Sequence, residues 1–225
     1  MNKLLILVIV SIILSSCKSK TLKITDANFL NALLTTQCVD TDGDRKADSN
    51  ADLNNDGKIQ FIEIENLEFL DVSSKDIQSL DGIQYFTNLQ TLNCYKNKLS
   101  ALDVSKNKKL ETLYCYDNEI KILNVSNNKN LINLGCRGNK LVELDLSQNK
   151  KLKKVLCYKN NLTQLNINNG NNANISTLWA SENPNLSCIK IDANFNQTNI
   201  PICDKENYSG WCKDSKTSYN FRCNN

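Results

Sequence analysis

The fold is decided by a stretch of 21 residues, 89–109, which reads LQTLNCYKNKLSALDVSKNKK. Its pattern, LxxLxCxxNxLxxLxVxxNxx, starts at Leu89 and returns at Leu110, Leu131 and Leu152. A period of roughly 20 to 50 residues is typical of solenoids, in which a single unit is too small to bury its own apolar face. We therefore expect a stack of similar coils that stabilise one another and need a cap at each end.

Each coil contains two similar halves, and both predict an extended segment. Apolar residues alternate in LxxLxC, so they point to one side, and equivalent segments should lie in parallel about 4.8 Å apart. The inward residues expected in the first halves are Leu89, Leu92, Cys94, Leu110, Leu113, Cys115, Leu131, Leu134, Cys136, Leu152, Val155 and Cys157. Those expected in the second halves are Leu99, Leu102, Val104, Ile120, Leu123, Val125, Leu141, Leu144, Leu146, Leu162, Leu165 and Ile167.

An asparagine follows each half-coil at a constant offset. The first halves are followed by Asn97, Asn118, Asn139 and Asn160, and the second halves by Asn107, Asn128 and Asn149. An asparagine at a fixed turn can bond backbone groups of its own coil and of the next one. These residues are expected to form a ladder that satisfies otherwise buried peptide groups.

The repeated residues resemble leucine-rich repeats, and more narrowly the short bacterial subclass with nested LxxLxLxxN and LxxLDLxxN halves, called IRREKO repeats. The LDLxxN portion appears as residues 102–107, LDVSKN, with echoes at 124–126 and 145–147. The resemblance covers about residues 67–191, with a first coil closer to the internalin-like repeat and a last coil degraded after an insertion at 168–173. It implies a solenoid of parallel β-strands stacked coil on coil, and it says little about function.

The N-terminal segment has the features of an export signal. Residues 1–3 precede an apolar run over 4–14, which is too short for a stable membrane span but suits a signal sequence. Residues 14–17, LSSC, resemble a lipobox, which implies a lipoprotein signal peptide over 1–16, acylation of Cys17 and a tether over 17–24. An ordinary secretory signal is the alternative. The expected location is the bacterial cell envelope, as an outer-membrane lipoprotein; because Lys18-Ser19-Lys20 lacks the acidic surface-export signal of Bacteroidetes-type lipoproteins, the surface and periplasmic faces both stay open.

The cysteines fall into two groups with different expected roles. Cys94, Cys115, Cys136 and Cys157 share one inward position, where the strand spacing disfavours disulfide geometry, so they are interpreted as reduced core residues rather than a metal ladder. Cys188, Cys203, Cys212 and Cys223 follow the last coil, and the sequence alone allows three pairings that would close a C-terminal cap over 192–225. The segment from Asn183 to Cys223 resembles the closing segment of flavobacterial leucine-rich repeat proteins, which implies the pairs Cys188–Cys223 and Cys203–Cys212. Cys38 has no obvious partner.

A calcium loop is predicted between the signal and the coils. Residues 52–63, DLNNDGKIQFIE, match the EF-hand loop at its diagnostic positions, including Gly57 at the bend. The predicted ligands of calcium, the one expected cofactor, are Asp52, Asn54, Asp56, Lys58 through its carbonyl, Gln60 and Glu63. A solvated turn rich in Asp and Asn is the alternative. The site would stiffen an N-terminal cap over 25–66, in which residues 25–34 are expected to be helical.

A second, weaker calcium site is predicted just before this loop. Residues 40–48, DTDGDRKAD, resemble the DxDGDxxxD calcium repeats of extracellular proteins such as thrombospondins. The resemblance implies ligation by Asp40, Asp42, Asp44 and Asp48. Arg45 stands where glycine is usual, which puts the local turn in question.

The outward residues of the first halves suggest a binding face. Tyr, Trp and Arg are enriched at binding hot spots, and aromatic rings also stack on sugars. The alternative is that the tyrosines stack on one another and steady the sheet. The predicted ligand face consists of Tyr95, Tyr114, Tyr116, Arg137, Tyr158 and Trp179, with Tyr95, Tyr116, Tyr158 and Arg137 at its centre.

Composition and motifs argue against enzyme chemistry and nucleic-acid binding. The chain has no histidine, no GxSxG and no phosphate-binding glycine loop, so no catalytic residues are predicted. With 27 basic and 24 acidic side chains the net charge is +3, and the lysines near 106–109 and 150–153 are interpreted as a solvated turn edge. The expected function is a monomeric, lipid-anchored, calcium-stabilised envelope protein that binds proteins or glycans. A structural spacer or assembly lipoprotein without a dedicated ligand is the alternative.

Overall fold

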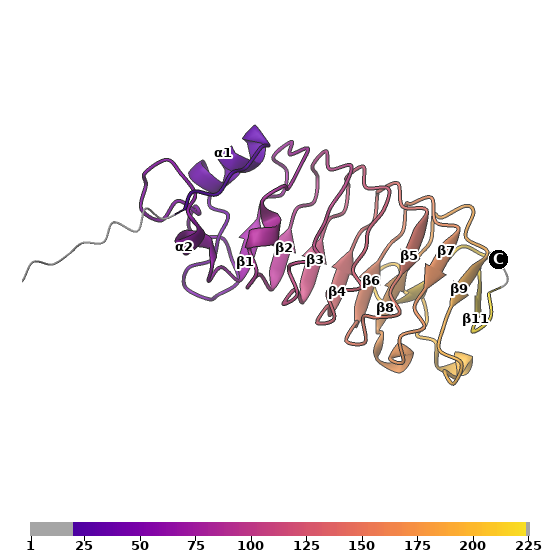
Figure 1. Cartoon of the computed structure of the whole chain (residues 1–225). Coiled ribbons are helices and arrows are strands. Elements are labelled where there is room, and N and C mark those ends of the chain that lie inside the picture. The colour runs from indigo at the N-terminus through magenta and orange to yellow at the C-terminus, as the bar shows by residue number, and fades with distance from the viewer. Residues whose placement is uncertain (1–19, 224–225) are drawn as a thin grey trace, which may run out of the picture.

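The chain folds into an elongated parallel β-solenoid with a helical cap at its N-terminal end (Figure 1). We analysed a computed structural model, which describes residues 20–223. The predicted signal peptide over 1–16, the predicted acylation site Cys17 and residues 17–19 of the tether predicted over 17–24 lie outside the described residues. Within those residues no helix is long and apolar enough to cross a membrane.

The coils are built from short strands, and each strand of the described residues is three residues long. The helices are α1 (Ala27–Thr35) and α2 (Phe61–Ile64), with 3-10 turns at η1 (Ile83–Tyr85), η2 (Asn172–Asn174) and η3 (Gln197–Asn199). The strands are β1 (Phe69–Asp71), β2 (Thr91–Asn93), β3 (Thr112–Tyr114), β4 (Asn133–Gly135), β5 (Glu143–Asp145), β6 (Lys154–Leu156), β7 (Gln164–Asn166), β8 (Thr177–Trp179), β9 (Cys188–Lys190), β10 (Gly210–Cys212) and β11 (Ser218–Asn220).

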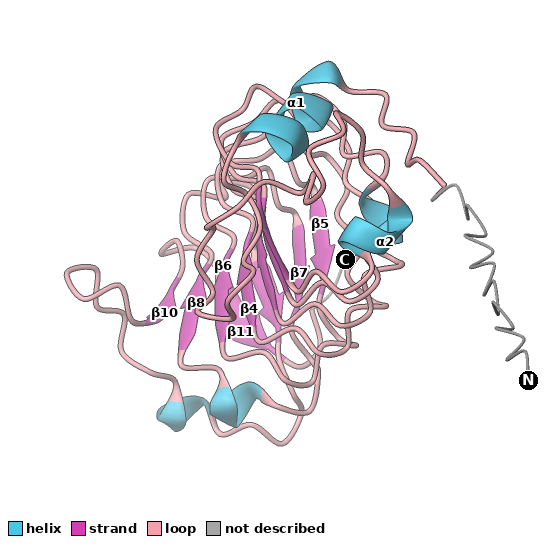
Figure 2. Cartoon of the chain, turned by 90° about the vertical axis from the view of Figure 1, so that its left-hand side faces the viewer, coloured by secondary structure: helices cyan, strands magenta, loops and turns pink. Residues whose placement is uncertain are grey.

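Two parallel sheets form the long sides of the solenoid (Figures 1 and 2). The first side has seven strands in the order β1-β2-β3-β4-β6-β8-β10, and the second side has four in the order β11-β9-β7-β5. Leu92 pairs with Leu113, Leu113 with Leu134, and Leu134 with Val155, so equivalent repeat positions are in register. The predicted leucine-rich repeat solenoid is confirmed.

The interior follows the repeat pattern. All of the inward residues predicted for the four regular coils are buried, because alternate side chains of each extended segment point away from solvent. The thiols of Cys94, Cys115, Cys136 and Cys157 are completely buried and free. They occupy the same place in successive coils, as the sequence predicts.

The two halves of a coil are less alike than the sequence suggests. Leu102 and Leu123 are buried as expected, but strands on the second side begin only at β5. In the earlier coils of that side, neighbouring coils are joined by isolated backbone bonds such as Glu119 N–H to Leu99 O, 2.9 Å. The buried pattern is therefore retained there without a full strand ladder.

Both ends of the solenoid are capped. Asp26 accepts from Phe29 N–H at the start of α1 and from Gln78 and Ser79 N–H in the first coil, which fastens the helix to the repeats. Helix α1 spans Ala27–Thr35, close to the predicted 25–34. At the other end, β10 and β11 extend the two sheets, and the structure joins Cys188 to Cys223 and Cys203 to Cys212. These are the two pairs that the resemblance implies.

Candidate binding face and cap sites

Four side chains form a continuous row on the first side, which we call the aromatic column: Tyr95, Tyr116, Arg137 and Tyr158. Each follows the buried cysteine of its coil. Because the cysteine points inward, the next side chain points outward, two residues beyond the end of the strand. All four side chains are partly buried. The solenoid therefore places the four residues predicted as the centre of the ligand face next to one another.

Stacking holds the aromatic column together. The rings of Tyr95 and Tyr116 are nearly parallel, with centroids 4.4 Å apart. The Arg137 guanidinium lies 4.3 Å from the centroid of Tyr116 and 5.6 Å from that of Tyr158. Contacts of these kinds contribute roughly 0.5 to 1.5 kcal/mol each. Both faces of the Tyr116 ring are therefore covered by neighbours, so Tyr116 presents its ring edge and hydroxyl group outward.

An ion pair fixes the position of Arg137. Its Nη1 lies 3.1 Å from Asp117 Oδ1 in the preceding coil, and both side chains are largely shielded from solvent. Asp117 reaches this position over Gly138, where an added Cβ would collide with the Asp117 carboxylate. Gly138 also has a left-handed backbone, with φ of +61°. The glycine thus makes room for the carboxylate that orients Arg137.

The environment of the column keeps its central tyrosine neutral. Desolvation by the neighbouring side chains, helped by the stacked Tyr95, raises the pKa of Tyr116 to about 12. Its hydroxyl group is therefore protonated at any physiological pH and can both donate and accept a hydrogen bond.

The other two predicted face residues are buried more deeply. Tyr114 lies over Gly135, where an added Cβ would approach its ring to 2.9 Å. Trp179 is only 8% exposed, because Tyr208 stacks on it with ring centroids 5.1 Å apart. The indole N–H of Trp179 has no acceptor among the described residues. Trp179 extends the face as a support for Tyr208 rather than as an open ring.

Tyr208 is a face residue that the sequence analysis missed. It is 64% exposed and lies in the loop closed by the Cys203–Cys212 disulfide, outside the repeat pattern. Its backbone is left-handed, with φ of +52°, which is unusual for an aromatic residue. The signal in the sequence was its place in a short disulfide loop, since such a loop is held close to the last strands.

In the predicted EF-hand loop, the side chains at the first and last positions bond backbone N–H groups of the loop. Asp52 accepts from the N–H groups of Asp56 and Gly57, and Gly57 has φ of +77°. Glu63, in the first turn of α2, accepts from Asn54 N–H at 3.2 Å and from Gln60 N–H at 2.8 Å. The structure thus brings the side chains at the first and last positions of the loop toward its centre.

The donor set of this loop fits calcium. Asp52 and Glu63 are 5% and 6% exposed, and neither forms an ion pair within the described residues. The Gln60 amide donates to Asp56 Oδ2 at 2.7 Å and accepts from the Asn54 amide, so oxygen-bearing side chains face one another. Buried carboxylates without a cation are costly. Lys58 would contribute only its carbonyl oxygen, and its N–H bonds Asp56.

The preceding loop gathers three of its four predicted ligands. Carboxylate oxygens of Asp40, Asp42 and Asp48 lie within 4.8 Å of one another. Asp44 instead pairs with Lys46 at 3.0 Å. Arg45 adopts the left-handed conformation that glycine would supply, with φ of +66°, and its N–H bonds Asp40 Oδ2. The expected turn is therefore present despite the arginine.

Comparisons with known proteins bear on the fold. No protein-family description and no curated protein matches the sequence. Among solved structures, the functional domain of InlJ from Listeria monocytogenes, described as including a cysteine ladder, is 22% identical with a TM-score of 0.57 over 86% of this chain and 46% of that one. The leucine-rich repeat ectodomain of the receptor kinase SOBIR1 from Arabidopsis thaliana is 16% identical with a TM-score of 0.50, over 73% of this chain and 91% of that one.

These likenesses define the class of protein. The chain is a leucine-rich repeat solenoid, and it spans about half the length of the InlJ domain that it matches. At such sequence identities the likeness shows the fold alone, so function has to be argued from the surface of this chain.

Proposed function

We propose that this chain is a non-catalytic scaffold that binds a protein partner through the aromatic column. The observation that carries the proposal is the clamped guanidinium of Arg137, held by Asp117 at 3.1 Å and by two tyrosine rings. A side chain already fixed in place loses little entropy when it binds, which is the property of an interface anchor.

The column favours a protein over a glycan as partner. Sugar recognition by stacking needs an open ring face, whereas Tyr116 is covered on both sides by Tyr95 and Arg137. Ring edges, hydroxyl groups and an oriented guanidinium suit backbone carbonyls and carboxylates of a protein surface. Binding of neutral glycans by the column would contradict this preference.

A comparison of captured proteins tests the proposal. The full chain, a Tyr116→Ala/Arg137→Ala variant and a control with Asn124→Ala and Asn166→Ala on the second side would each be exposed to the same cell-surface protein preparation. We expect partners retained by the full chain and the control to be lost from the column variant, with circular dichroism unchanged. Identical capture by all three proteins would overturn the proposal.

Calcium stabilisation is part of the proposed function. Asp52 and Glu63 supply buried carboxylates, and a bound cation would offset their repulsion and desolvation. We expect calcium to raise the thermal midpoint of the full chain relative to chelator. Glu63→Gln should abolish most of this shift, whereas Asp44→Asn, in a residue that pairs with Lys46, should preserve it. An equal calcium shift in both variants would exclude the loop as the site.

Export and lipid anchoring at Cys17 complete the proposal. They rest on the lipobox-like residues 14–17. Acylation by more than one chain would give stable membrane attachment. Cys17→Ser should remove incorporation of labelled palmitate, and unchanged incorporation would rule out this anchor.

A structural spacer is a second candidate function, favoured by the mutual stacking of the column. If stacking serves stability alone, the Tyr116→Ala/Arg137→Ala variant should lose stability without losing any partner. A receptor should lose the partner while it stays folded. The capture experiment, read together with a denaturation curve, separates the two functions.

A further inference from the structure

Three lysines occupy the same place in successive coils, outside the aromatic column. Lys108, Lys129 and Lys150 each follow the buried asparagine that ends a second half-coil, and all three are exposed. The asparagines fix their register, because Asn128 donates to Asn107 O and Asn149 donates to Asn128 O, both at 2.9 Å. Neighbouring coils are spaced by roughly the strand separation of 4.8 Å. The three lysines therefore form a row along the solenoid axis, which we call the lysine row.

Further lysines broaden this row. They are exposed and lie on the same turns or just after them: Lys106, Lys109, Lys151 and Lys153. None of these seven lysines forms an ion pair within the described residues. Lys151 donates to the Asn130 amide oxygen at 2.8 Å. Acidic groups are also near: Asp103, whose pKa is lowered by Ser105 and by the charge of Lys106, its counterpart Asp145 beside the turn 147–151, and the partly buried Glu111.

Elsewhere the solenoid pairs opposite charges from coil to coil. The distances are 2.9 Å for Lys98–Asp76, 3.1 Å for Arg137–Asp117, 2.7 Å for Lys140–Glu119 and 3.8 Å for Lys159–Glu182. Like charges on neighbouring strands repel and lower stability. The lysine row has no such pairs, so its charges repel one another across neighbouring coils without an ion pair that offsets the repulsion.

We propose that the lysine row binds an anionic polysaccharide that lies along the solenoid axis. A row of charges at regular intervals suits a linear polymer whose carboxylate or sulfate groups also repeat at regular intervals. The turns 105–109, 126–130 and 147–151 add serine, asparagine and glutamine side chains that can bond sugar hydroxyl groups. In the sequence Lys108, Lys129 and Lys150 recur at the 21-residue period, and the register of the coils brings them together as a site.

The surroundings of the row argue against two other polyanions. Single-stranded nucleic acids are held by aromatic side chains on which bases stack, and these three turns contain no aromatic residue. Peripheral membrane binding combines basic residues with inserted apolar side chains, and the same turns contain no exposed apolar residue.

The test measures binding of the full chain to two fluorescent probes, heparin and polygalacturonate, with neutral dextran as reference. Lys108→Gln/Lys129→Gln/Lys150→Gln removes the row. The matched control, Lys121→Gln/Lys205→Gln/Lys216→Gln, makes the same charge change at exposed lysines elsewhere. We expect the row variant to lose roughly tenfold in affinity for at least one charged probe and the control to lose less than about threefold, with binding weakened by salt.

Each other result would overturn the proposal. Equal losses in the two variants would reduce the effect to net charge. Binding to dextran, or to neither charged probe, would remove the site. Tighter binding to single-stranded DNA or to anionic phospholipid vesicles would assign the row to a different polyanion. The row variant should also unfold at a higher temperature than the control, since only it relieves repulsion between coils, and a lower midpoint would show that the lysines are structural.

Discussion

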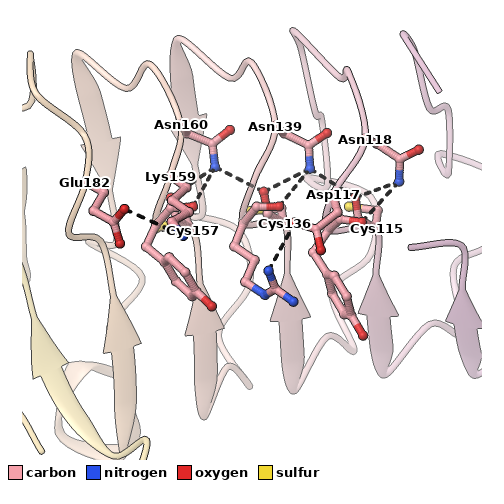
Figure 3. A network of polar contacts seen from close by, with 12 residues as sticks. Cys115, Asp117, Asn118, Cys136, Asn139, Cys157, Lys159, Asn160 and Glu182 are labelled. Carbon is pink, nitrogen blue, oxygen red and sulfur yellow. Dashed lines mark hydrogen bonds and ion pairs between the residues drawn. The ribbon is translucent and has the colours of Figure 1, made fainter. Parts of the chain in front are cut away.

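The two asparagine ladders occupy equivalent turns, yet they are satisfied differently. On the first side, the Asn118 amide nitrogen donates to the carbonyls of Cys94 and Cys115, and its oxygen accepts from Leu99 N–H at 3.0 Å. Figure 3 shows Asn118, Asn139 and Asn160 in this row. On the second side, Asn128 donates to two carbonyls in the same way, but its buried Oδ1 has no donor among the described residues.

The difference extends along both ladders. Asn107 and Asn149 also have buried Oδ1 atoms without a donor in the described chain, whereas Asn139 and Asn160 repeat the full set of bonds. The fully bonded ladder lies on the side with seven strands and the aromatic column. An equivalent sequence position therefore does not imply an equivalent energetic role, and the side with the fully hydrogen-bonded ladder is the one that carries the proposed binding face.

The largest expected effect comes from removing one residue of each ladder. Asn118→Ala leaves the Leu99 N–H group buried without a partner, whereas the Cys94 and Cys115 carbonyls each keep the bond from a neighbouring ladder asparagine. We expect a loss of about 3 kcal/mol in unfolding free energy. Asn128→Ala leaves no group without a partner, because the Val104 and Asn107 carbonyls keep their bonds from the Asn107 and Leu110 N–H groups, and it removes an unpartnered oxygen, so the loss should be about 1 kcal/mol. Urea denaturation followed by circular dichroism measures both values.

Leu165→Ala, on the second side, serves as the control for a general loss of buried contacts. If Asn128→Ala destabilised the chain as much as Asn118→Ala, the two ladders would be energetically equivalent and the contrast drawn from their hydrogen bonds would be wrong.

The sequence predicts the features that follow from the constant 21-residue period, and these include most features of the first side. The inward positions, the row of thiols and the aromatic column all follow from the 21-residue spacing once strands lie in parallel. The strand-free coils of the second side do not follow from it, because Leu102 and Leu123 fit the same pattern as Leu144. Whether a strand ladder forms there depends on backbone geometry that the apolar pattern does not encode.

The features that the sequence analysis missed are those whose position in space does not follow from the 21-residue repeat. Tyr208 belongs to no repeat, and it reaches the face only because a disulfide loop folds back over Trp179. The exposure of Trp179 was overestimated for the same reason. The lysine row is the opposite case. Its residues follow the repeat, but whether they form a candidate binding site depends on which charged side chains of the neighbouring coils lie beside them.

A smaller effect should separate the two sides at alkaline pH. Burial raises the pKa of the Cys115 and Cys157 thiols from 9.0 to about 12, whereas the second side has Val125 and Ile167 at the corresponding positions. The pKa of each thiol is higher in the folded state than in the unfolded state. The thiol therefore leaves the free energy of unfolding unchanged below pH 9 and lowers it as the pH rises from 9 toward 12. The loss approaches about 1.4 kcal/mol per pH unit for each such thiol.

Cys115→Val and Cys157→Val should therefore each flatten the dependence of unfolding free energy on pH above 9, measured by urea denaturation under reducing conditions. Val125→Cys should steepen it by placing a buried thiol on the second side. A pH profile that none of these changes alters would mean that the thiols stay protonated in both states, or that tyrosines control the alkaline transition.

The smallest expected effect concerns the turns that follow the strands of the first side. Lys96 has a left-handed backbone with φ of +52°, and the equivalent Asp117 and Lys159 have the same conformation, whereas no second-side turn of the described coils uses a non-glycine residue in this way. Lys96→Gly should relieve this strain and, after the entropy cost of glycine, stabilise the chain by about 0.5 kcal/mol. Gln148→Gly, in a second-side turn, should instead destabilise it by a similar amount.

Asp117→Gly separates backbone strain from function, because it relieves the same left-handed strain but removes the carboxylate that holds Arg137. If Lys96→Gly were destabilising in thermal melts, hydrogen bonding of the turn would outweigh its backbone strain, and the first side would gain its rigidity from these residues as well as from its asparagines.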